Sequence, residues 1–163
     1  PVFVDDIKKM GLEQVTVVSP DVGGIKAARS FAKRLNAELA VVDKRRVNSK
    51  QAEVMNIMGD VEGRNIVIVD DIISTAGSVT EAAQALKNKG AKDIYCYITH
   101  PILVGLALER IKNSPIKLLN VSDSIPIGDK TNEKRIKVLS VAKLLGEAIK
   151  RIHKNESVSS LFI

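Results

Sequence analysis

The sequence predicts an α/β fold in which a parallel β-sheet carries helices on both faces. Short runs of β-branched apolar residues alternate with longer segments of helical periodicity, which is the pattern of strands joined by crossover helices. Residues 66–69 are the clearest strand, because four β-branched apolar residues in a row suit a buried parallel strand and are too few for a helix. The 163 residues are enough for one domain, 1–163, with a real core. An aromatic content of 3% predicts that this core is aliphatic.

The other elements follow from the same alternation along the chain. We expect strands at residues 15–18, 39–42, 94–98 and 117–121, and helices at residues 25–35, 103–111 and 141–152 and from residue 79 up to Gly90. A short helical pattern precedes them and is stopped by Gly11. Residues 54–57 and Val61 are typical of a ribbon or of edge strands. The tail from Asn155 has no continuing helical pattern, and we expect from its Val, Leu and Phe residues that it docks on something.

Composition limits the possible partners. A hydrophobic content of 45% with 27% charged residues is typical of a soluble globular protein. The net charge of +6 would allow nucleic acid, but no basic stripe is interleaved with aromatic residues. We therefore expect phosphorylated small molecules as ligands and no nucleic acid. No apolar run approaches membrane-spanning length and no signal peptide is present, so we expect no membrane partner.

The only cysteine and the first residue suggest where and how the chain occurs. Cys96 lies in an expected strand, which favours an inert buried thiol, a reducing compartment and a cytoplasmic protein. The chain begins with Pro1 rather than methionine, so we expect it to be a piece of a longer polypeptide.

The segment after strand 66–69 predicts a binding site for a phosphorylated sugar. Asp70 and Asp71 come where we expect the strand to end, and small or branched residues with one glycine lead into a helix at Val79. A tight loop between a strand and a helix start exposes backbone N–H groups to an anion. The two carboxylates suit vicinal sugar hydroxyls, directly or through a divalent cation. The alternative is a capped helix after a strand, with both aspartates merely solvated.

Two further loops follow expected strands, where open α/β sheets place their ligands. Paired glycines, Gly23 and Gly24, expose backbone N–H groups after strand 15–18, and Asp21 is a candidate ligand for the Mg²⁺ that accompanies phosphates. Glycines in a tight turn can also serve geometry alone. Residues 43–46 carry three cations and begin a stretch without a core pattern, which predicts a mobile loop that closes over a polyphosphate. A solvated surface is the alternative.

His100 ends another expected strand. An imidazole there could act as a general base. Nothing around it in the sequence supplies a nucleophile, so we interpret His100 as a hydrogen-bonded structural residue.

The order of residues in 66–78 resembles the ribose 5-phosphate-binding signature of the phosphoribosyltransferase fold. Other motifs in the chain are Val18-Ser19-Pro20-Asp21-Val22-Gly23-Gly24, Asp43-Lys44-Arg45-Arg46, Glu53-Val54-Met55, Thr99-His100-Pro101 and Ser157-Val158-Ser159-Ser160-Leu161-Phe162. Together they resemble the ribose-phosphate pyrophosphokinase (phosphoribosyl pyrophosphate synthetase) family, from near Phe3 to the last residue. The match is to the C-terminal half of that family only. The family's N-terminal half supplies most of the ATP pocket, including a metal-binding histidine, and nothing here replaces it.

The resemblance implies an activity and its partners. The full enzyme would transfer the β,γ-diphosphoryl group of ATP to the C1 hydroxyl of ribose 5-phosphate, giving phosphoribosyl pyrophosphate and AMP for nucleotide biosynthesis. It would use Mg²⁺ and would form a homo-oligomer, a hexamer by resemblance. Because the ATP-binding half is absent, we expect the isolated chain to be inactive.

The resemblance also implies roles for individual residues. Lys44 and Arg46 would act on the transferred group, Asp21 would bind metal, and Gly23 and Gly24 would form the pyrophosphate-side loop. Ser157 and Ser159 would belong to an inter-subunit effector site for phosphate or a nucleoside diphosphate; the alternative is that this tail is a frayed terminus. The residues implied in ribose 5-phosphate binding are Asp70, Asp71, Ser74, Thr75, Ala76, Gly77 and Ser78. Members of the family commonly carry aspartate in place of Ser74 and threonine in place of Ser78; the first difference removes a negative charge from the loop.

Two alternatives use the same fold. A phosphoribosyltransferase would use the loop to break phosphoribosyl pyrophosphate, but we find no candidate for the base-binding hood that it needs. A non-catalytic regulatory paralogue would pair with active subunits, and loss of the loop carboxylates would favour it. Asp70 and Asp71 are both present.

Overall fold

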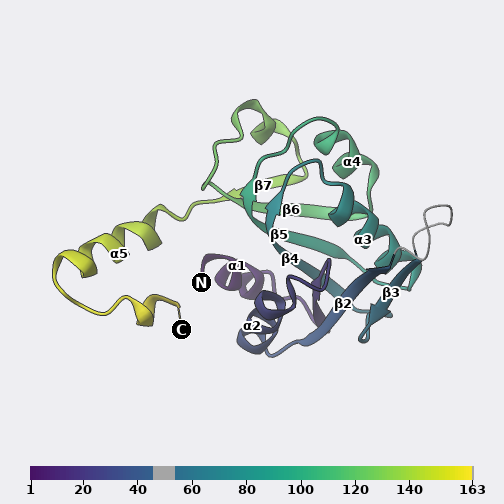
Figure 1. Cartoon of the computed structure of the whole chain (residues 1–163), viewed down its shortest axis with the longest axis horizontal. Helices are drawn as coiled ribbons and strands as arrows, with labels where there is room; N and C mark the ends of the chain where they lie inside the picture. The colour runs from purple at the N-terminus through teal and green to yellow at the C-terminus, as the bar shows by residue number, and fades with distance from the viewer. Residues whose placement is uncertain (46–53, 163) are drawn as a thin grey trace.

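The computed structural model describes residues 1–45 and 54–162 (Figure 1). Its strands are β1 (Val15–Ser19), β2 (Glu38–Arg45), β3 (Val54–Met58), β4 (Asn65–Ile73), β5 (Ile94–Pro101), β6 (Ile116–Ser122) and β7 (Ile136–Leu139). Its α-helices are α1 (Val2–Lys9), α2 (Ile25–Leu35), α3 (Gly77–Asn88), α4 (Ala107–Asn113) and α5 (Ala142–His153), with short 3₁₀ helices η1 (Gly128–Asn132) and η2 (Ser159–Phe162).

The strands form one seven-stranded sheet in the order β3-β2-β1-β4-β5-β6-β7. Every neighbouring pair is parallel except β2 and β3, which pair as an antiparallel ribbon at one edge. The central strands β4 and β5 are buried on both faces along most of their length. Parallel strands that are covered on both sides read as continuous apolar runs, which is why residues 66–69 were recognisable in the sequence.

Helices cover both faces of the sheet. One core cluster joins α1 and α2 to Val17, Val67 and Tyr97 of the sheet, and the other joins α3 and α4 to the opposite face through residues such as Ile68 and Leu86. The phenol of Tyr97 donates a hydrogen bond of 2.8 Å to Asp6 Oδ2 and so ties α1 to β5. The α/β class and the two-sided helical cover expected from the sequence are confirmed.

Several element boundaries differ from the expected ones. Strands β2 and β4 continue past residues 42 and 69, so Lys44, Asp70 and Asp71 lie within strands rather than after them. Helix α4 begins at Ala107 instead of residue 103, because Leu103 and Gly105 have left-handed φ angles of 51° and 57° that no α-helix allows. Strand β7 was missed; it is four residues long, and Lys137 and Val138 both lie exposed within it. Val61 lies buried in a loop rather than in a strand.

Helix α5 and the tail stand away from the sheet in Figure 1. No residue of α5 is buried, and Leu145, Ile149 and Ile152 are exposed. The tail returns toward α2, where the Arg34 guanidinium donates a hydrogen bond to the carbonyl of Phe162. This contact is made by the backbone and the Phe162 side chain is exposed, so docking through the tail's apolar residues stays a prediction. Among the helices in the described ranges, none has the length and apolar character needed to cross a membrane.

Candidate functional site

A cavity of about 290 Å³ lies at the carboxyl ends of β1 and β4. These two strands are neighbours and run parallel, so the loops that follow them meet at one edge of the sheet. All the residues that the sequence predicts for sugar-phosphate binding line this cavity, together with Asp21. The cavity is lined by Asp21, Asp70, Asp71, Ile72, Ile73, Ser74, Thr75, Ala76, Gly77, Ser78 and Val79.

The backbone carbonyls of the loop after β4 all have donors. The carbonyl of Ile73 accepts from the N–H groups of Ile102 (3.0 Å) and Leu103 (3.2 Å), and that of Ser74 accepts from Val104 N–H at 3.0 Å. The carbonyl of Thr75 accepts from Arg110 Nη1 at 2.9 Å. These donors come from the connection after β5 and from α4, none of which lines the cavity. Hydrogen bonds to its carbonyl groups, from residues that do not line the cavity, therefore fix the position of this loop.

The backbone N–H groups of residues 74–78 are left for a ligand. Within residues 1–45 and 54–162, none of them donates to an acceptor in the protein. Gly77 and Ser78 begin α3, whose first turn has unpaired donors and the positive end of the helix dipole. Ala76 precedes the helix with φ 62° and ψ 7°, a left-handed conformation unusual for a residue with a side chain. Such a loop provides the donors that a phosphate group needs.

Carboxylates face the cavity from its strand side. Asp70 is half-buried at the end of the core part of β4, and its Oδ1 accepts a hydrogen bond of 2.9 Å from the N–H of Asp71. The pKa of Asp70 is raised to about 6, chiefly by burial and in smaller part by its neighbours Asp71 and Asp21, against the lowering effect of that hydrogen bond. A cation or a set of hydroxyl donors in the cavity would relieve this excess of negative charge.

The donor set fits Mg²⁺ only as part of a shared site. No three acidic, histidine or cysteine side chains in the described part of the chain lie close enough to form a metal cluster by themselves. One oxygen of Asp21 already accepts from Gly24 N–H at 3.0 Å. One or two carboxylates, with water and substrate oxygens completing the shell, are nevertheless the usual protein contribution to a Mg²⁺ site. The residues present therefore fit the ion in that way.

Replacing Asp70 with asparagine should raise the melting temperature at pH 7.5 in EDTA. The pKa of the Asp70 carboxyl in the folded chain, about 6, lies above its ordinary value of 3.8. The free energy of unfolding therefore falls as the pH rises from about 4 to above 6, because the folded chain holds this proton more tightly than the unfolded chain. Asparagine removes that cost; for a half-buried group we expect roughly 1 kcal/mol, or about 2–4 °C. Most of the gain should vanish at pH 4, where the native carboxyl is protonated. Thermal unfolding followed by circular dichroism at both pH values measures the effect.

Asp93→Asn is the control of opposite sign. The hydrogen bond from Lys117 lowers the pKa of Asp93, so its stabilising effect is present at neutral pH and is lost on acidification. The substitution should therefore lower the melting temperature at pH 7.5. If Asp70→Asn also lowers the melting temperature at pH 7.5, the ionised Asp70 carboxylate stabilises the fold, and the proposed cost of its ionisation is wrong.

The glycine loop after β1 is shaped by close packing. Ser19 Oγ donates to the carbonyl of Asp21 at 2.6 Å, and Asp21 Oδ1 accepts from Gly24 N–H, which closes the turn before α2. A Cβ on Gly24 would lie 2.6 Å from Ser19 Oγ, closer than real Cβ contacts allow. A side chain at position 24 would therefore displace Ser19 Oγ and disturb its hydrogen bond to Asp21, which is a geometric reason for glycine here. The pyrophosphate role of Gly23 and Gly24 stays a prediction, because neither lines the cavity.

Lys44 lies in a strand and not in the mobile loop that we expected. It pairs with Met55 across the β2–β3 ribbon, because the antiparallel partner extends the strand beyond its apolar part. Its Nζ lies 2.8 Å from Glu81 Oε2, one turn into α3, the helix whose first residues line the cavity. Arg46 lies outside the described residues, as does the loop expected at 47–51.

Of two further polar residues near this edge of the sheet, the sequence analysis considered one and missed the other. His100 Nδ1 lies 2.9 Å from Ser124 Oγ, so the expected hydrogen-bonded histidine is confirmed. The sequence analysis did not select Arg110, although its guanidinium contacts the Thr75 carbonyl in the loop after β4. It lies 35 residues from Thr75, and no local pattern in the sequence distinguishes it from other arginines on helices.

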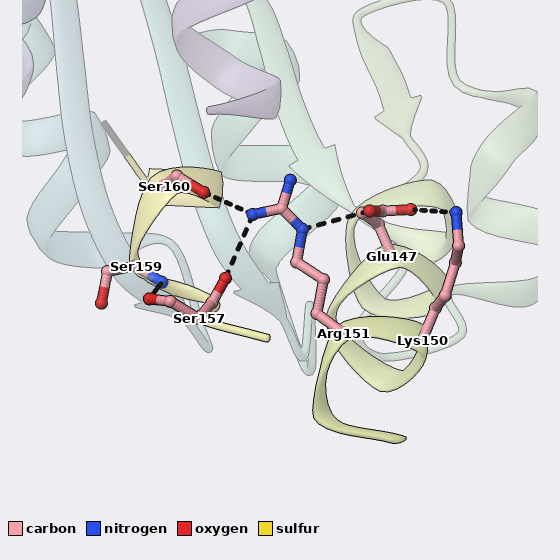
Figure 2. Close-up of polar contacts among 6 residues, drawn as sticks. All are labelled: Glu147, Lys150, Arg151, Ser157, Ser159 and Ser160. Carbon is pink, nitrogen blue, oxygen red and sulfur yellow. Dashed lines mark hydrogen bonds and ion pairs between the residues drawn. The ribbon is translucent and has the colours of Figure 1, made fainter. Parts of the chain in front are cut away.

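The tail that carries the predicted effector serines is organised around Arg151 (Figure 2). The Arg151 guanidinium donates to the Ser157 carbonyl at 3.1 Å and to Ser160 Oγ, and its Nε lies 3.1 Å from Glu147 Oε1. Ser157 Oγ accepts from the N–H of Ser159 at 3.3 Å. The hydrogen bond from Arg151, followed by the charge of Lys150, lowers the pKa of Glu147. Of the tail's serine hydroxyls, Ser160 Oγ is the one that these contacts place against Arg151, and neither Ser157 nor Ser159 lines the cavity at β4.

Comparison with known proteins gives one consistent result. The family described as "Phosphoribosyl synthetase-associated domain" matches residues 43–163. Curated proteins named ribose-phosphate pyrophosphokinase are 49% identical over 162 residues in Oceanobacillus iheyensis and 51% identical over 162 residues in Halalkalibacterium halodurans, in each case over 99% of this chain and 51% of the relative. The chain thus spans about half the length of the curated relatives it matches.

A solved structure agrees with these relatives. The crystal structure of phosphoribosylpyrophosphate synthetase from Mycobacterium smegmatis superposes with a TM-score of 0.86 and 29% sequence identity. The match covers 94% of this chain and 50% of that one. Most of this chain therefore has a structural counterpart in half of a phosphoribosylpyrophosphate synthetase.

Proposed function

This chain belongs to the phosphoribosyl synthetase-associated domain family, and its fold matches that of a phosphoribosylpyrophosphate synthetase, so we propose that it is the ribose 5-phosphate-binding half of a ribose-phosphate diphosphokinase. The full enzyme would convert ATP and ribose 5-phosphate to AMP and phosphoribosyl pyrophosphate. The observation that carries the proposal is the cavity after β4, where unpaired loop N–H groups and two strand-borne aspartates face the same space.

Each group in the cavity has a place in this reaction. The N–H groups of residues 74–78 and the hydroxyls of Thr75 and Ser78 would hold the 5-phosphate at the start of α3. Asp70 and Asp71 would accept hydrogen bonds from the ribose hydroxyls, directly or through water on Mg²⁺. Ser74 keeps the loop neutral next to a dianionic phosphate, where an aspartate would repel it.

Mg²⁺ would be held by Asp21 with help from Asp70 or Asp71 and by oxygens of the substrates. When bound, it would neutralise charge on the phosphates of ATP. The protein's own contribution is to hold the C1 hydroxyl in line with the β-phosphorus and to add positive charge to the transferred group. We assign that charge to Lys44 and Arg46. Lys44 would have to exchange Glu81 for the phosphoryl oxygens, which costs little because an exposed ion pair contributes at most about 1 kcal/mol.

The proposal extends to the assembly and its regulation. We assign ATP binding to the half of the relatives that this chain does not match, and we propose a homo-oligomer in the cytoplasm. Ser157 and Ser159 would contribute to an effector site for phosphate or a nucleoside diphosphate. The Arg151 guanidinium, which donates hydrogen bonds to the Ser157 carbonyl and to Ser160 Oγ in the same tail, supplies a positive charge that supports an anion there.

The isolated chain should bind ribose 5-phosphate without turning it over. Isothermal titration with ribose 5-phosphate should give saturable heat, whereas ribose, which lacks the phosphate, should give none at the same concentration. An assay with ATP, ribose 5-phosphate and Mg²⁺ should release no AMP. No binding of ribose 5-phosphate would contradict the proposed site. Robust AMP release would contradict the assignment of ATP binding to another segment.

A further inference from the structure

The phosphate loop is held from outside by one side chain of another helix. Among the described residues, Arg110 of α4 is the only side chain from outside α3 that donates to a loop carbonyl in 73–76; the other loop carbonyls accept from backbone N–H groups or, at Ala76, from Thr80 of α3 itself. Its Nη1 lies 2.9 Å from the oxygen of Thr75. A Cβ on Gly77 would lie 3.4 Å from the same nitrogen, so the guanidinium extends along the outer side of the loop as far as the start of α3.

This contact determines where a neighbouring N–H group points. In a trans peptide the C=O of one residue and the N–H of the next point in opposite directions, and the described chain has no cis peptide. With the Thr75 carbonyl turned outward to Arg110, the N–H of Ala76 must point away from Arg110. Ala76 itself lines the cavity, and its N–H has no acceptor in the described protein. The Arg110 hydrogen bond thus aims a loop donor at the ligand.

The peptide between Thr75 and Ala76 has a reason to turn over. Ala76 has φ 62°, a left-handed conformation that is unfavourable for a residue with a Cβ. Rotating this one peptide would bring Ala76 to a negative φ and relieve that cost. It would also turn the Thr75 carbonyl into the cavity, where its oxygen would repel a phosphate. A donor on the outer side of the loop opposes this rotation.

We propose that Arg110 is a positioning residue for the phosphate-binding loop: by holding the Thr75 carbonyl outward it keeps the Ala76 N–H directed at the 5-phosphate. The inference rests on the proposed ribose 5-phosphate site and adds to it a residue that does not line the cavity. It predicts that removal of Arg110 weakens sugar-phosphate binding and leaves the groups that act on ATP unaffected.

Calorimetry on this chain separates the possibilities. Arg110→Met should weaken ribose 5-phosphate binding about tenfold, the effect of losing one hydrogen bond from a charged donor at an exposed site. Arg110→Lys, which keeps a charged donor, should recover part of the loss. Arg135→Met is the matched control: Arg135 Nη1 also donates to backbone carbonyls, those of Lys112 and Ser114, but it does not contact the loop, and its loss should change the affinity less than twofold.

A double-mutant cycle tests the peptide rotation itself. Glycine accepts a left-handed φ without strain, so Ala76→Gly removes the reason for the peptide to turn over. Arg110→Met should then cost only about twofold in the Ala76→Gly background. A tenfold loss in both backgrounds would overturn the mechanism, because Arg110 would then act through its charge alone.

The full-length enzyme supplies a readout that general destabilisation would not give. There Arg110→Met should raise the KM for ribose 5-phosphate and leave kcat and the KM for ATP unchanged. If all three change together, or if Arg110→Met binds ribose 5-phosphate as wild type does, the inference is wrong although the proposed function stands. If the wild-type chain itself does not bind ribose 5-phosphate, the proposed function fails first.

Discussion

Replacing Lys44 with alanine in the full-length enzyme is expected to reduce kcat about a hundredfold or more with little change in the KM for either substrate. The ammonium group would stabilise charge that develops only as the diphosphoryl group is transferred, so its loss affects the transition state and not the bound ground state. In the structure, Lys44 Nζ lies 2.8 Å from Glu81 Oε2 on α3, which places the cation near the helix that begins at the cavity. Steady-state kinetics with AMP detection measures both constants.

Lys117→Ala is the matched control for Lys44→Ala. Lys117 forms an ion pair of the same length, 2.8 Å, with Asp93, at the opposite end of the parallel strands from the cavity. Its loss should leave kcat within twofold. A Lys44→Ala enzyme in which only KM rises would show that Lys44 is a ground-state binding contact.

Replacing Ala76 with valine should both destabilise the chain and abolish ribose 5-phosphate binding. Ala76 is 4% exposed, belongs to the core cluster under α3, and has φ 62°. A β-branched side chain is strained at that φ, and its extra methyl groups must enter a packed core. Together we expect a loss of about 2–4 kcal/mol, which corresponds to roughly 5–15 °C in melting temperature. Thermal unfolding and calorimetry measure the two effects.

Two variants separate the causes of that loss. Ala83→Val overpacks the same core from the middle of α3, where the backbone is helical, and should lower stability while ribose 5-phosphate still binds. Ala76→Gly permits the left-handed backbone, so it should change stability by less than about 1 kcal/mol and retain binding. Retained binding in Ala76→Val would mean that the loop tolerates another backbone conformation and that its present geometry is not needed.

Sequence patterns selected the residues that line the cavity but not the residues from other elements that hold them in place. The residues from Asp70 to Ser78 could be read from an apolar strand, two acids and a short loop with one glycine, because each signal is local and has a physical cause. The strand bounds around Asp70 and Lys44 were wrong for one reason. Both strands continue past their apolar parts, since hydrogen bonds to a neighbouring strand extend a ladder whether or not the side chains are buried.

The sequence by itself determined the order of the helices and of every strand but β7, the aliphatic core, and the loops that carry polar residues at strand ends. These features depend on periodicity and on turn chemistry within a few residues. Only the tertiary structure decided that Arg110 holds the Thr75 carbonyl, that Glu81 pairs with Lys44, and that burial raises the pKa of Asp70. Each of these depends on how elements far apart in the chain pack against one another. A contact over 35 or 37 residues leaves no local pattern, because its energy arises only after the sheet has brought the two segments together.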